Sequence, residues 1–268
     1  MSTRLKDKVA IITGGGYGIG KAIAKAFVQE GATVVLAATT LPKLKETEKE
    51  LQAMGGKVMA VQTDVRDEKQ IKHMVDETIK AFGRIDILVN NSGIGGPTCN
   101  VVDMKLDEWN NILSIDLTGS MLCSREALKH MIPRKTGVVI NLAAEGGRSG
   151  DGRSGYPMRA GYCCAKMGVI GLTETLAQEV GEYNIRVNAI SAAAVKGDRF
   201  IRVIQGRADA LKIPFEQALN NEMRNYSLKR PAEEYELASI AVFLASEESS
   251  AITGQTVIGH CGQHIPFK

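Results

Sequence analysis

The sequence predicts an α/β fold in which one domain contains a doubly wound parallel sheet of about seven strands. Short apolar runs alternate with segments of helical pattern along most of the chain, and this alternation is typical of right-handed β–α–β crossovers. Most of the runs are continuously apolar, as expected for parallel strands that are covered on both faces. A glycine-rich turn follows the first run, which is where such sheets bind nucleotides.

The predicted strands are short runs rich in β-branched and aliphatic residues, and helical patterns lie between them. The strands cover Val9–Thr13, Thr33–Ala37, Val58–Thr63, Ile85–Asn90, Val138–Asn141, Ile185–Ile190 and Thr256–Ile258. The helices cover Gly20–Gln29, Pro42–Met54, Glu68–Phe82, Asp107–Met131, Tyr162–Val180 and Glu233–Ala245. The polar segment Asp198–Lys229 falls outside this rhythm. We interpret it as an insertion, about residues 198–229, near the ligand site beyond the strand ends.

The composition is that of a globular enzyme and excludes several other classes. The 268 residues are 44% hydrophobic and 24% charged, which is too apolar for a disordered chain. A formal charge of +3 gives little support for a nucleic-acid partner. No apolar run is long enough to span a bilayer, and the first ten residues hold no apolar signal core. We therefore expect a cytoplasmic protein with no membrane partner.

The cysteines and histidines predict neither a disulfide framework nor a metal site. The five cysteines are odd in number and show no CxxC spacing, and the four histidines are scattered. Free thiols in a reducing compartment fit this usage better than disulfides or zinc ligands.

The turn after the first strand has the residues needed to bind a pyrophosphate. Gly14 permits a sharp exit from the strand, and Gly18 lets the backbone approach the phosphates. Gly20 allows close packing of the following helix on the strand, with Tyr17 and Ile19 between these glycines. The start of that helix offers free N–H groups and the positive end of a dipole.

These residues, TGGGYGIG, resemble the TGxxxGxG signature of the short-chain dehydrogenase/reductase family. Further motifs follow in the family's order. Asp64-Val65 comes after the third strand, where the family's aspartate contacts adenine, and Asn90-Asn91-Ser92-Gly93 resembles NNAG. Tyr162 to Lys166 matches YxxxK, and Asn188-Ala189-Ile190-Ser191 begins the family's motif on the sixth strand. The resemblance covers about residues 5 to 262 and implies a Rossmann-like fold that binds NAD(P)(H). The cofactor-binding residues that it implies are Gly14, Tyr17, Gly18, Ile19, Gly20, Thr39, Asp64, Val65, Asn91, Ser92, Gly93, Tyr162, Lys166 and Val195.

Tyr162 and Lys166 are the predicted catalytic pair. They are four residues apart on a predicted helix, so their side chains share a face. A free tyrosine titrates near ~10, and a nearby ammonium lowers that value. Such a phenol can exchange a proton with an alcohol or ketone oxygen while a hydride moves to or from the cofactor. In the family the lysine also binds the nicotinamide ribose.

The family's catalytic serine is missing from its usual seat. That seat, after the fifth strand, aligns with Ala144, so a hydrogen-bond donor aimed at developing charge is lost. One explanation is a serine-to-alanine change that impairs turnover and traps a bound substrate. The other is a substitute hydroxyl, and Ser149 lies 13 residues before Tyr162, close to the family's serine-to-tyrosine spacing.

Asp116 aligns with the asparagine that serves as the family's fourth catalytic residue. In the family that asparagine supports a water molecule leading from the lysine. An aspartate at this position could hold such a water and would keep Lys166 cationic. The alternative interpretation is a solvated acid on a helix surface. After the sixth strand the family's Pro-Gly is replaced by Ala192-Ala193, while Val195 keeps the position whose backbone meets the nicotinamide.

The residues after the second strand leave the choice between NAD and NADP open, with a slight preference for NADP. An acid there would bind the ribose hydroxyls and repel a 2′-phosphate, whereas an arginine would attract it. The sequence has Ala37-Ala38-Thr39-Thr40, and Tyr17 occupies the position where phosphate-preferring relatives often carry a basic residue. Lys43 is a candidate helper, or else a solvated lysine.

The resemblance implies an oxidoreductase that interconverts a secondary alcohol and a ketone on a small or cyclic substrate. A 3-oxoacyl group on a carrier protein is the alternative substrate, and a non-catalytic dinucleotide-binding protein is the rival from another class. An anionic substrate could pair with basic residues near the site, which are Arg148, Arg153, Arg159, Arg199, Arg202, Arg207 and Lys212. The simpler interpretation is that most of these are solvated.

The two long helices Asp107–Met131 and Tyr162–Val180 carry apolar residues on more than one face. One face must cover the sheet, and the remaining apolar surface favours a contact between subunits. Members of the family pair these helices into four-helix bundles, so a homotetramer is expected, with a dimer as the alternative.

Overall fold

Seven parallel strands form one twisted sheet in the order β3-β2-β1-β4-β5-β6-β7. The computed structural model describes residues 3–144, 155–192, 194–224 and 226–263. The strands are β1 (Val9–Thr13), β2 (Thr33–Ala38), β3 (Val58–Gln62), β4 (Ile87–Asn90), β5 (Gly137–Ala144), β6 (Ile185–Ala192) and β7 (Thr256–Gly259). The predicted doubly wound parallel sheet is therefore confirmed, with a change of winding direction between β1 and β4.

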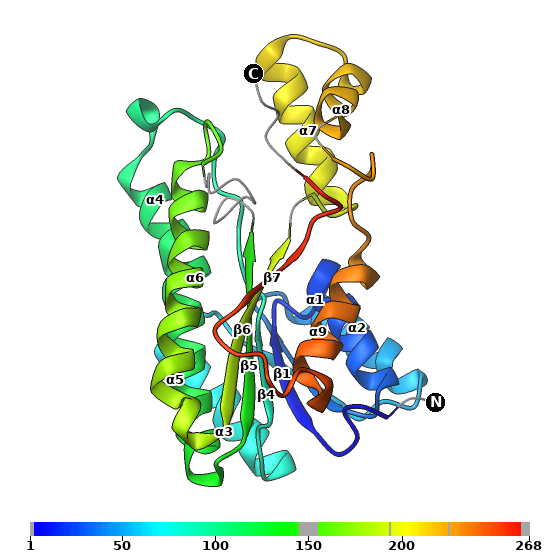
Figure 1. Ribbon diagram of the computed structural model, residues 1–268, viewed down its shortest axis with the longest axis vertical. Coiled ribbons are helices and arrows are strands. Elements are labelled where there is room, and N and C mark those ends of the chain that lie inside the picture. The colour runs from blue at the N-terminus through cyan, green and yellow to red at the C-terminus, as the bar shows by residue number, and fades with distance from the viewer. Residues whose placement is uncertain (1–2, 145–154, 193, 225, 264–268) are drawn as a thin grey trace.

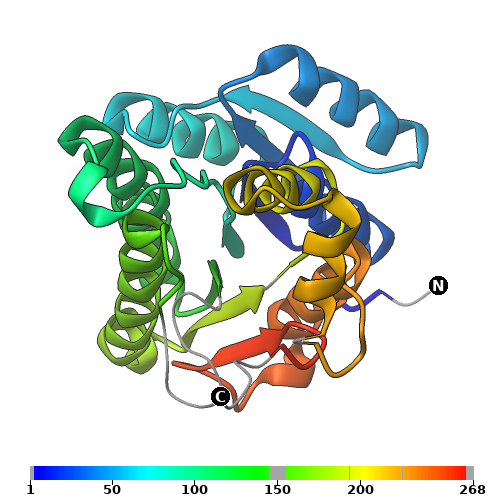
Figure 2. The same ribbon diagram turned by 90° about the horizontal axis from the view of Figure 1, so that it is seen from above.

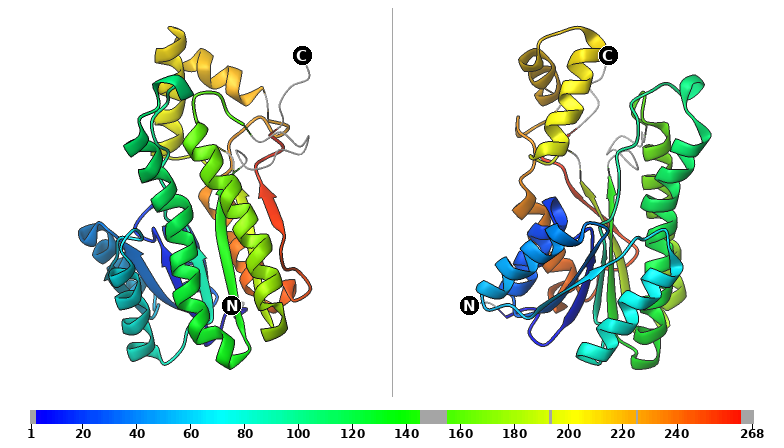
Figure 3. Two further views of the ribbon diagram at one scale, coloured as in Figure 1. Left: turned by 90° about the vertical axis from the view of Figure 1, so that its left-hand side faces the viewer. Right: turned by 180° about the vertical axis from the view of Figure 1, so that it is seen from behind.

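Helices cover both faces of this sheet, as Figures 1 and 3 show. The helices α1 (Gly18–Gln29), α2 (Leu41–Ala53) and α9 (Glu234–Ala245) lie on one face. The helices α3 (Glu68–Phe82), α4 (Leu106–Leu113), α5 (Gly119–Met131) and α6 (Ala160–Val180) lie on the other. Short 3₁₀ turns cover Val101–Asp103, Ile132–Arg134, Gly181–Tyr183 and Glu247–Ser249. Each face has its own apolar core, because the buried strands point alternate side chains to opposite sides.

The fifth and sixth strands are longer than the sequence pattern predicts. Their pairing continues beyond the expected ends, through Leu142 with Ile190 to Ala144 with Ala192. Small alanine side chains at these positions do not break the apolar run, and both strand ends are buried. The extension carries the two central strands toward the site described below.

The single helix expected over Asp107–Met131 is interrupted. α4 and α5 are separated by a π-helical turn, Ser114–Thr118. The hydroxyl of Ser114 donates to the carbonyl of Asn111, and that of Ser120 donates to the carbonyl of Asp116. These local bonds accompany the wider turn, a feature that often occurs at functional sites. Here it carries Asp116.

The segment expected as an insertion forms two helices, α7 (Asp198–Leu211) and α8 (Phe215–Met223). Buried Ile204, Ala208 and Ala218 join them in a small core of their own, and Arg207 forms an ion pair with Glu222. Figures 1 and 2 show this pair of helices above the carboxyl ends of the strands.

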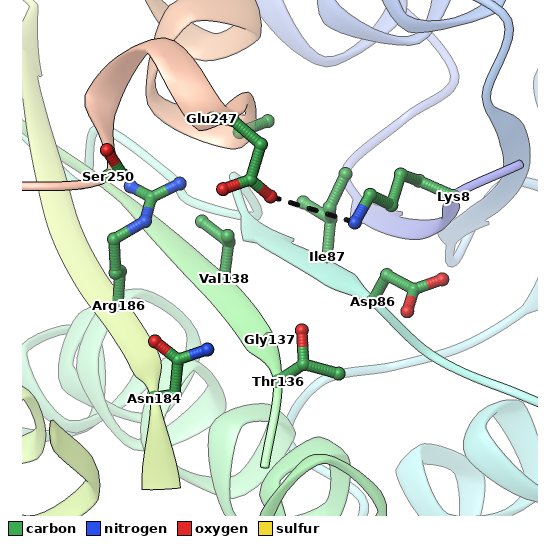
Figure 4. A pocket seen from close by; sticks show the side chains of 11 residues that line it. Lys8, Asp86, Ile87, Thr136, Gly137, Val138, Asn184, Arg186, Glu247 and Ser250 are labelled. Carbon is green, nitrogen blue, oxygen red and sulfur yellow. Dashed lines mark ion pairs between the residues drawn. The ribbon is translucent and has the colours of Figure 1, made fainter. Parts of the chain in front are cut away.

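A shallow pocket lies at the opposite, amino end of the sheet, and its charges serve the fold (Figure 4). Arg186 donates to the carbonyl of Ser246 and the hydroxyl of Ser249, both at 2.9 Å, and so satisfies acceptors that follow α9. Burial lowers the pKa of this guanidinium. Asp86 accepts a hydrogen bond from the amide of Val9 at 2.9 Å. None of the helices described is long and apolar enough to cross a membrane.

Candidate active site

The sequence-predicted residues gather where the strands end at their carboxyl side, between α6 and α1. Thr13, Asn90 and Ala144 are the last residues of three neighbouring strands, β1, β4 and β5. Loops that leave adjacent parallel strands in opposite directions open a crevice at this point, which is the usual ligand position in such sheets.

The glycine turn has the backbone geometry that its residues predict. Gly14 and Gly18 have φ values of +65° and +59°, in the left-handed region that glycine tolerates best. The amide of Gly14 donates to the carbonyl of Ala37 at 2.7 Å, which fixes the turn on β2. A side chain on Gly20 would overlap the Gly14 carbonyl oxygen and the Asn91 side chain. This position therefore accepts only glycine.

Thr13 ties the glycine turn to the segment after β4, a role that sequence reasoning missed. Its hydroxyl oxygen accepts hydrogen bonds from the amides of Asn91 and Ser92, both at 3.0 Å. The Asn91 side chain in turn donates to the carbonyls of Thr13 and Gly14, at 2.9 and 3.2 Å. Two predicted cofactor-binding motifs are thus held as one rigid unit.

The start of α1 fits the pyrophosphate of a dinucleotide. Tyr17 precedes the helix in extended conformation without a capping bond from its side chain, and the first turn holds no acidic residue. The N–H groups and the positive dipole end of α1 are thus available to phosphate oxygens. Gly18, Ile19 and Gly20 are the residues that would hold them. A bound nicotinamide nucleotide would supply or accept a hydride at its nicotinamide ring.

Tyr162, Lys166 and Asp116 form a compact group, as the sequence predicts. The Lys166 Nζ atom lies 5.8 Å from the centroid of the Tyr162 ring and 3.3 Å from the Asp116 Oδ2 atom. It also donates to the carbonyl of Leu142 at 2.8 Å. A Cβ atom on Gly93 would come within 2.9 Å of the Asp116 carboxylate, so glycine is needed here to let the backbone approach.

Asp116 is fully buried, so the alternative of a solvated helix acid is wrong. Its Oδ1 atom accepts a hydrogen bond from the amide of Ile94 at 2.7 Å, and its other oxygen faces Lys166. A buried carboxylate needs a nearby cation and hydrogen-bond donors to remain charged. The π-helical turn positions Asp116 so that it has both.

Ala144 is the last residue of β5, buried, and paired with Ala192. The strand context thus places a methyl group at the predicted serine seat. Ser149, the alternative hydroxyl, lies outside the described residues, as do Arg148 and Arg153.

A buried polar network supports the floor of the site. The Asn90 side-chain amide donates to Asn141 at 2.8 Å and to the Ser124 hydroxyl at 2.9 Å. Asn141 donates to the Thr173 hydroxyl at 2.9 Å. These bonds join β4 and β5 to α5 and α6, and they follow from a tertiary approach that sequence spacing does not reveal.

The predicted adenosine residues lie along the ends of β2 and β3. Asp64 forms an ion pair with Arg66 at 2.6 Å, and hydrogen bonding from that guanidinium lowers the pKa of Asp64. The Thr39 carbonyl accepts a hydrogen bond from Gln62 at 2.9 Å. The Lys43 Nζ atom lies 5.2 Å from the centroid of the exposed Tyr17 ring. Lys43, on α2, thus lies beside the glycine turn.

The loop after β6 is tied to the segment before α9. Val195 and Ala232 form a parallel bridge, with the Lys196 amide donating to the Ala232 carbonyl at 2.8 Å. The Ala232 amide donates to the Ala194 carbonyl at 2.9 Å. This loop is therefore anchored even though Ala192-Ala193 replace the family's Pro-Gly.

Arg159 is a further residue of the site that the sequence analysis gave only a general role. Its guanidinium carbon lies 5.0 Å from the centroid of the Tyr162 ring. No group of histidine, cysteine and acidic residues suited to a metal ion occurs in the described ranges.

The chain matches a family model and is similar to curated reductases and a dehydrogenase along most of its length. Residues 14–264 match the model described as enoyl-(acyl carrier protein) reductase. The chain is 35% identical to a 3-oxoacyl-[acyl-carrier-protein] reductase of Thermotoga maritima, which covers 95% of this chain and 96% of that one. It is 33% identical to meso-2,3-butanediol dehydrogenase of Serratia marcescens, with coverage of 95% and 93%. It is 36% identical to a probable 2,4-dienoyl-CoA reductase of Bacillus subtilis, with coverage of 97% and 98%.

Solved structures with the same fold contain either nicotinamide cofactor. A NAD⁺-bound xylitol dehydrogenase superposes with a TM-score of 0.91 at 28% identity, covering 97% of this chain and 100% of that one. An actinorhodin polyketide ketoreductase with NADPH gives a TM-score of 0.90 at 28% identity, covering 98% of each chain. The likeness extends over the whole sheet and its helices, and with the family match and the curated relatives it shows that this chain belongs to the short-chain dehydrogenase/reductase family of oxidoreductases.

Proposed function

We propose that this protein interconverts a secondary alcohol and a ketone on a small or cyclic substrate, anionic ones included, with a nicotinamide cofactor. The observation that carries the proposal is the group of Tyr162, Lys166 and Asp116 at the carboxyl ends of the strands, beside the glycine turn. A protein that only binds a dinucleotide has no need for a phenol held against a buried ammonium.

In the proposed reaction Tyr162 exchanges a proton with the substrate oxygen. Lys166 is fixed by the Leu142 carbonyl and the Asp116 carboxylate, so its ammonium stays in place beside the phenol ring. A further N–H of Lys166 is available to the cofactor ribose, the role that the lysine has in the family. Asp116 positions Lys166 and supports the proton path. The methyl group of Ala144 contributes no hydrogen bond.

An acyl thioester is the second candidate substrate. The relatives named above include reductases that act on acyl groups carried by a protein or by coenzyme A. α7 and α8 beyond the strand ends offer a surface for such a carrier, and the region 198–229 is proposed to line the substrate site.

NADP is the proposed cofactor, although relatives use either form. The ends of β2 and α2 carry no acidic side chain at residues 37–43 that would repel a 2′-phosphate. Lys43, beside Tyr17, is the cation proposed to receive it.

A homotetramer in the cytoplasm is the proposed state. Support for the assembly comes from exposed Met121 on α5 and Met167 on α6, two large apolar side chains on the outer faces of adjacent helices. Gly171 lies one turn further along α6 and has no neighbour within 4 Å, so it would permit close approach of a second subunit. The location rests on the cysteine usage of the sequence.

The experiment that tests this function compares Tyr162→Phe with the unchanged protein. Turnover of NADPH or NADP⁺ is followed by absorbance with 2,3-butanediol, acetoin, a cyclic diketone and an acetoacetyl thioester. We expect the variant to lose at least ~100-fold in kcat, the usual contribution of a general acid–base, while cofactor affinity measured by fluorescence stays unchanged. Tyr235→Phe, at an exposed position on α9, is the matched control and retains activity.

Retention of more than about a tenth of the rate by Tyr162→Phe would exclude a proton-transfer role of the usual size. Tight cofactor binding without turnover of any of these substrates by the unchanged protein would favour the non-catalytic dinucleotide-binding alternative.

A further inference from the structure

Ala144 provides no hydrogen-bond donor at the seat from which the family's serine faces the reacting oxygen. When a carbonyl carbon receives a hydride, the electron pair of the C=O bond moves to the oxygen, which then takes the proton of Tyr162. Until that proton arrives, negative charge builds on the oxygen, and a donor aimed at it lowers the barrier. The methyl group of Ala144 cannot serve.

Arg159 brings a cation to the Tyr162 ring from the start of α6. Its guanidinium lies over the Tyr162 ring, with the central carbon 5.0 Å from the ring centroid. The residue is half-buried, and its Nε atom is shielded from solvent. Tyr162 lies one helical turn after Arg159, so the helix itself fixes their relative position.

The place of Arg159 in α6 is electrostatically unfavourable for the helix alone. It is the residue that precedes a helix of 21 residues, and its side chain makes no capping bond there. A cation at the positive end of a helix dipole is unfavourable for the helix. A residue that destabilises its own helix is often retained because it has a function.

The charge of Arg159 acts on neighbouring groups of the site. It favours the thiolate of Cys163, although burial is the larger effect and raises the pKa of that thiol. Lys166 is paired with the Asp116 carboxylate at 3.3 Å. Lys166 therefore offers less net positive charge to an oxygen outside this pair than it would beside a neutral asparagine.

We propose that Arg159 contacts the substrate oxygen and stabilises its developing negative charge, in place of the serine that is absent at Ala144. Resting on the proposed ketone–alcohol function, this assigns a catalytic residue that the common sequence motifs do not contain. A planar guanidinium with several donors can hold an oxyanion as well as a hydroxyl can, and it retains its charge at all working pH values.

The test is a cycle of Arg159→Gln and Ala144→Ser, singly and combined. The substrate is the neutral N-acetylcysteamine thioester of acetoacetate with NADPH, which has no phosphate that an arginine could bind. We expect Arg159→Gln to lower kcat by about 100-fold, as loss of an oxyanion donor does, and to change KM by less than about threefold. Arg159→Lys is expected to recover part of the loss, since it keeps the charge.

The combined variant distinguishes replacement of serine from a structural role. Ala144→Ser is expected to restore at least about tenfold in the Arg159→Gln background and clearly less in the unchanged protein, because the two donors serve one oxygen. Cofactor affinity and thermal midpoint, measured on each variant, are expected to stay the same. Arg4→Gln, which removes a positive charge that is ion-paired with Glu30 near the amino end of the sheet, is the matched control.

Two results would overturn the assignment. One is an Arg159→Gln variant that keeps more than about a third of kcat, too small an effect for an oxyanion donor. The other is an equal gain from Ala144→Ser in both backgrounds. Failure of the proposed function itself would look different, since Tyr162→Phe would then remain as active as the unchanged protein.

Discussion

A carboxylate that is shielded from water must be balanced nearby, and Asp116 shows how a single residue changes the character of this site. Its oxygens face the Ile94 amide and the Lys166 ammonium, and the Gly93 backbone packs closely against both side chains of this pair. The neutral asparagine of the family would leave Lys166 with its full charge. With aspartate the pair is close to neutral, which increases the importance of any other cation at the ring.

Lys43 is expected to decide the preference for NADP. Lys43→Gln removes the cation at the start of α2, so the affinity for NADP⁺ should fall by roughly tenfold, about 1.4 kcal/mol, while that for NAD⁺ stays the same. Fluorescence titration with both nucleotides measures this. Lys45→Gln on the same helix, where Lys45 pairs with Glu48, is the control. An equal loss of affinity for both cofactors would assign Lys43 a general role in stabilising the bound nucleotide.

The residues of the site differ in how far the sequence reveals them. Tyr162 and Lys166 could be placed together because a spacing of four fixes a shared helix face. The motif located Asp116 but not its burial, which depends on the π-helical turn. Thr13 could not be found at all, because its partner amide in Asn91 is 78 residues away in the chain. The stacking of Arg159 on the Tyr162 ring could not be predicted either, because the sequence does not distinguish this arginine from one on the surface.

At the scale of elements, the start of α9 brings a carboxyl group to the glycine turn. The Glu234 Oε1 atom would lie 3.7 Å from a Cβ atom on Gly18 and 3.4 Å from one on Gly197. Burial raises the pKa of Glu234, and Glu233 and Asp198 add to this effect while Lys21 opposes it. α9 thus places a carboxyl group with a raised pKa next to the start of α1.

The sign of the resulting pH dependence follows from the raised pKa. A carboxyl group that binds its proton more tightly in the folded chain stabilises the fold at low pH, and that contribution is lost as pH rises through the folded pKa. Glu234→Gln removes the charge, so the thermal midpoint at neutral pH should increase, whereas near the ordinary value of 4.5 it should hardly change. Differential scanning fluorimetry over this pH range measures it.

Glu46→Gln, at an exposed position on α2, is the control for removal of a glutamate from the surface. A lower midpoint for Glu234→Gln at neutral pH would contradict the expected destabilisation by the charged form.

Element boundaries were predictable where local pattern determines them. The helix Glu68–Phe82 matches its predicted range, because Asp67 caps its start with bonds to the amides of Lys69 and Gln70, and Gly83 ends it in the left-handed region. The break in Asp107–Met131 was not predictable, since the apolar pattern continues through it. The ends of β5 and β6 depend on their mutual pairing, which a single strand does not encode.

At the scale of the whole molecule, assembly is expected to depend on the outer face of α5 and α6. Val169 lies against Ala143 and Ala189 and is therefore part of the core, so a charge there would unfold the subunit. Met167, by contrast, is 38% exposed. Met167→Glu is expected to convert a tetramer into smaller species without loss of helical content.

Light scattering and circular dichroism at micromolar concentration measure this result. Met54→Glu, at an exposed apolar position after α2, is the control and should leave the mass unchanged. A mass of one chain for the unchanged protein would refute the tetramer.

The strand order has a consequence for the newly made chain. β1 lies between β2 and β4, and its amide at Val9 bonds to Asp86, 77 residues later. During synthesis β1 can pair with β2, and β2 with β3, as soon as these strands have emerged, but the other edge of β1 stays open until β4 has emerged. An apolar edge of Val9–Thr13 without a partner can pair with another chain. The stage between β3 and β4 is therefore when a nascent chain is most exposed to aggregation, and when a chaperone has most to protect.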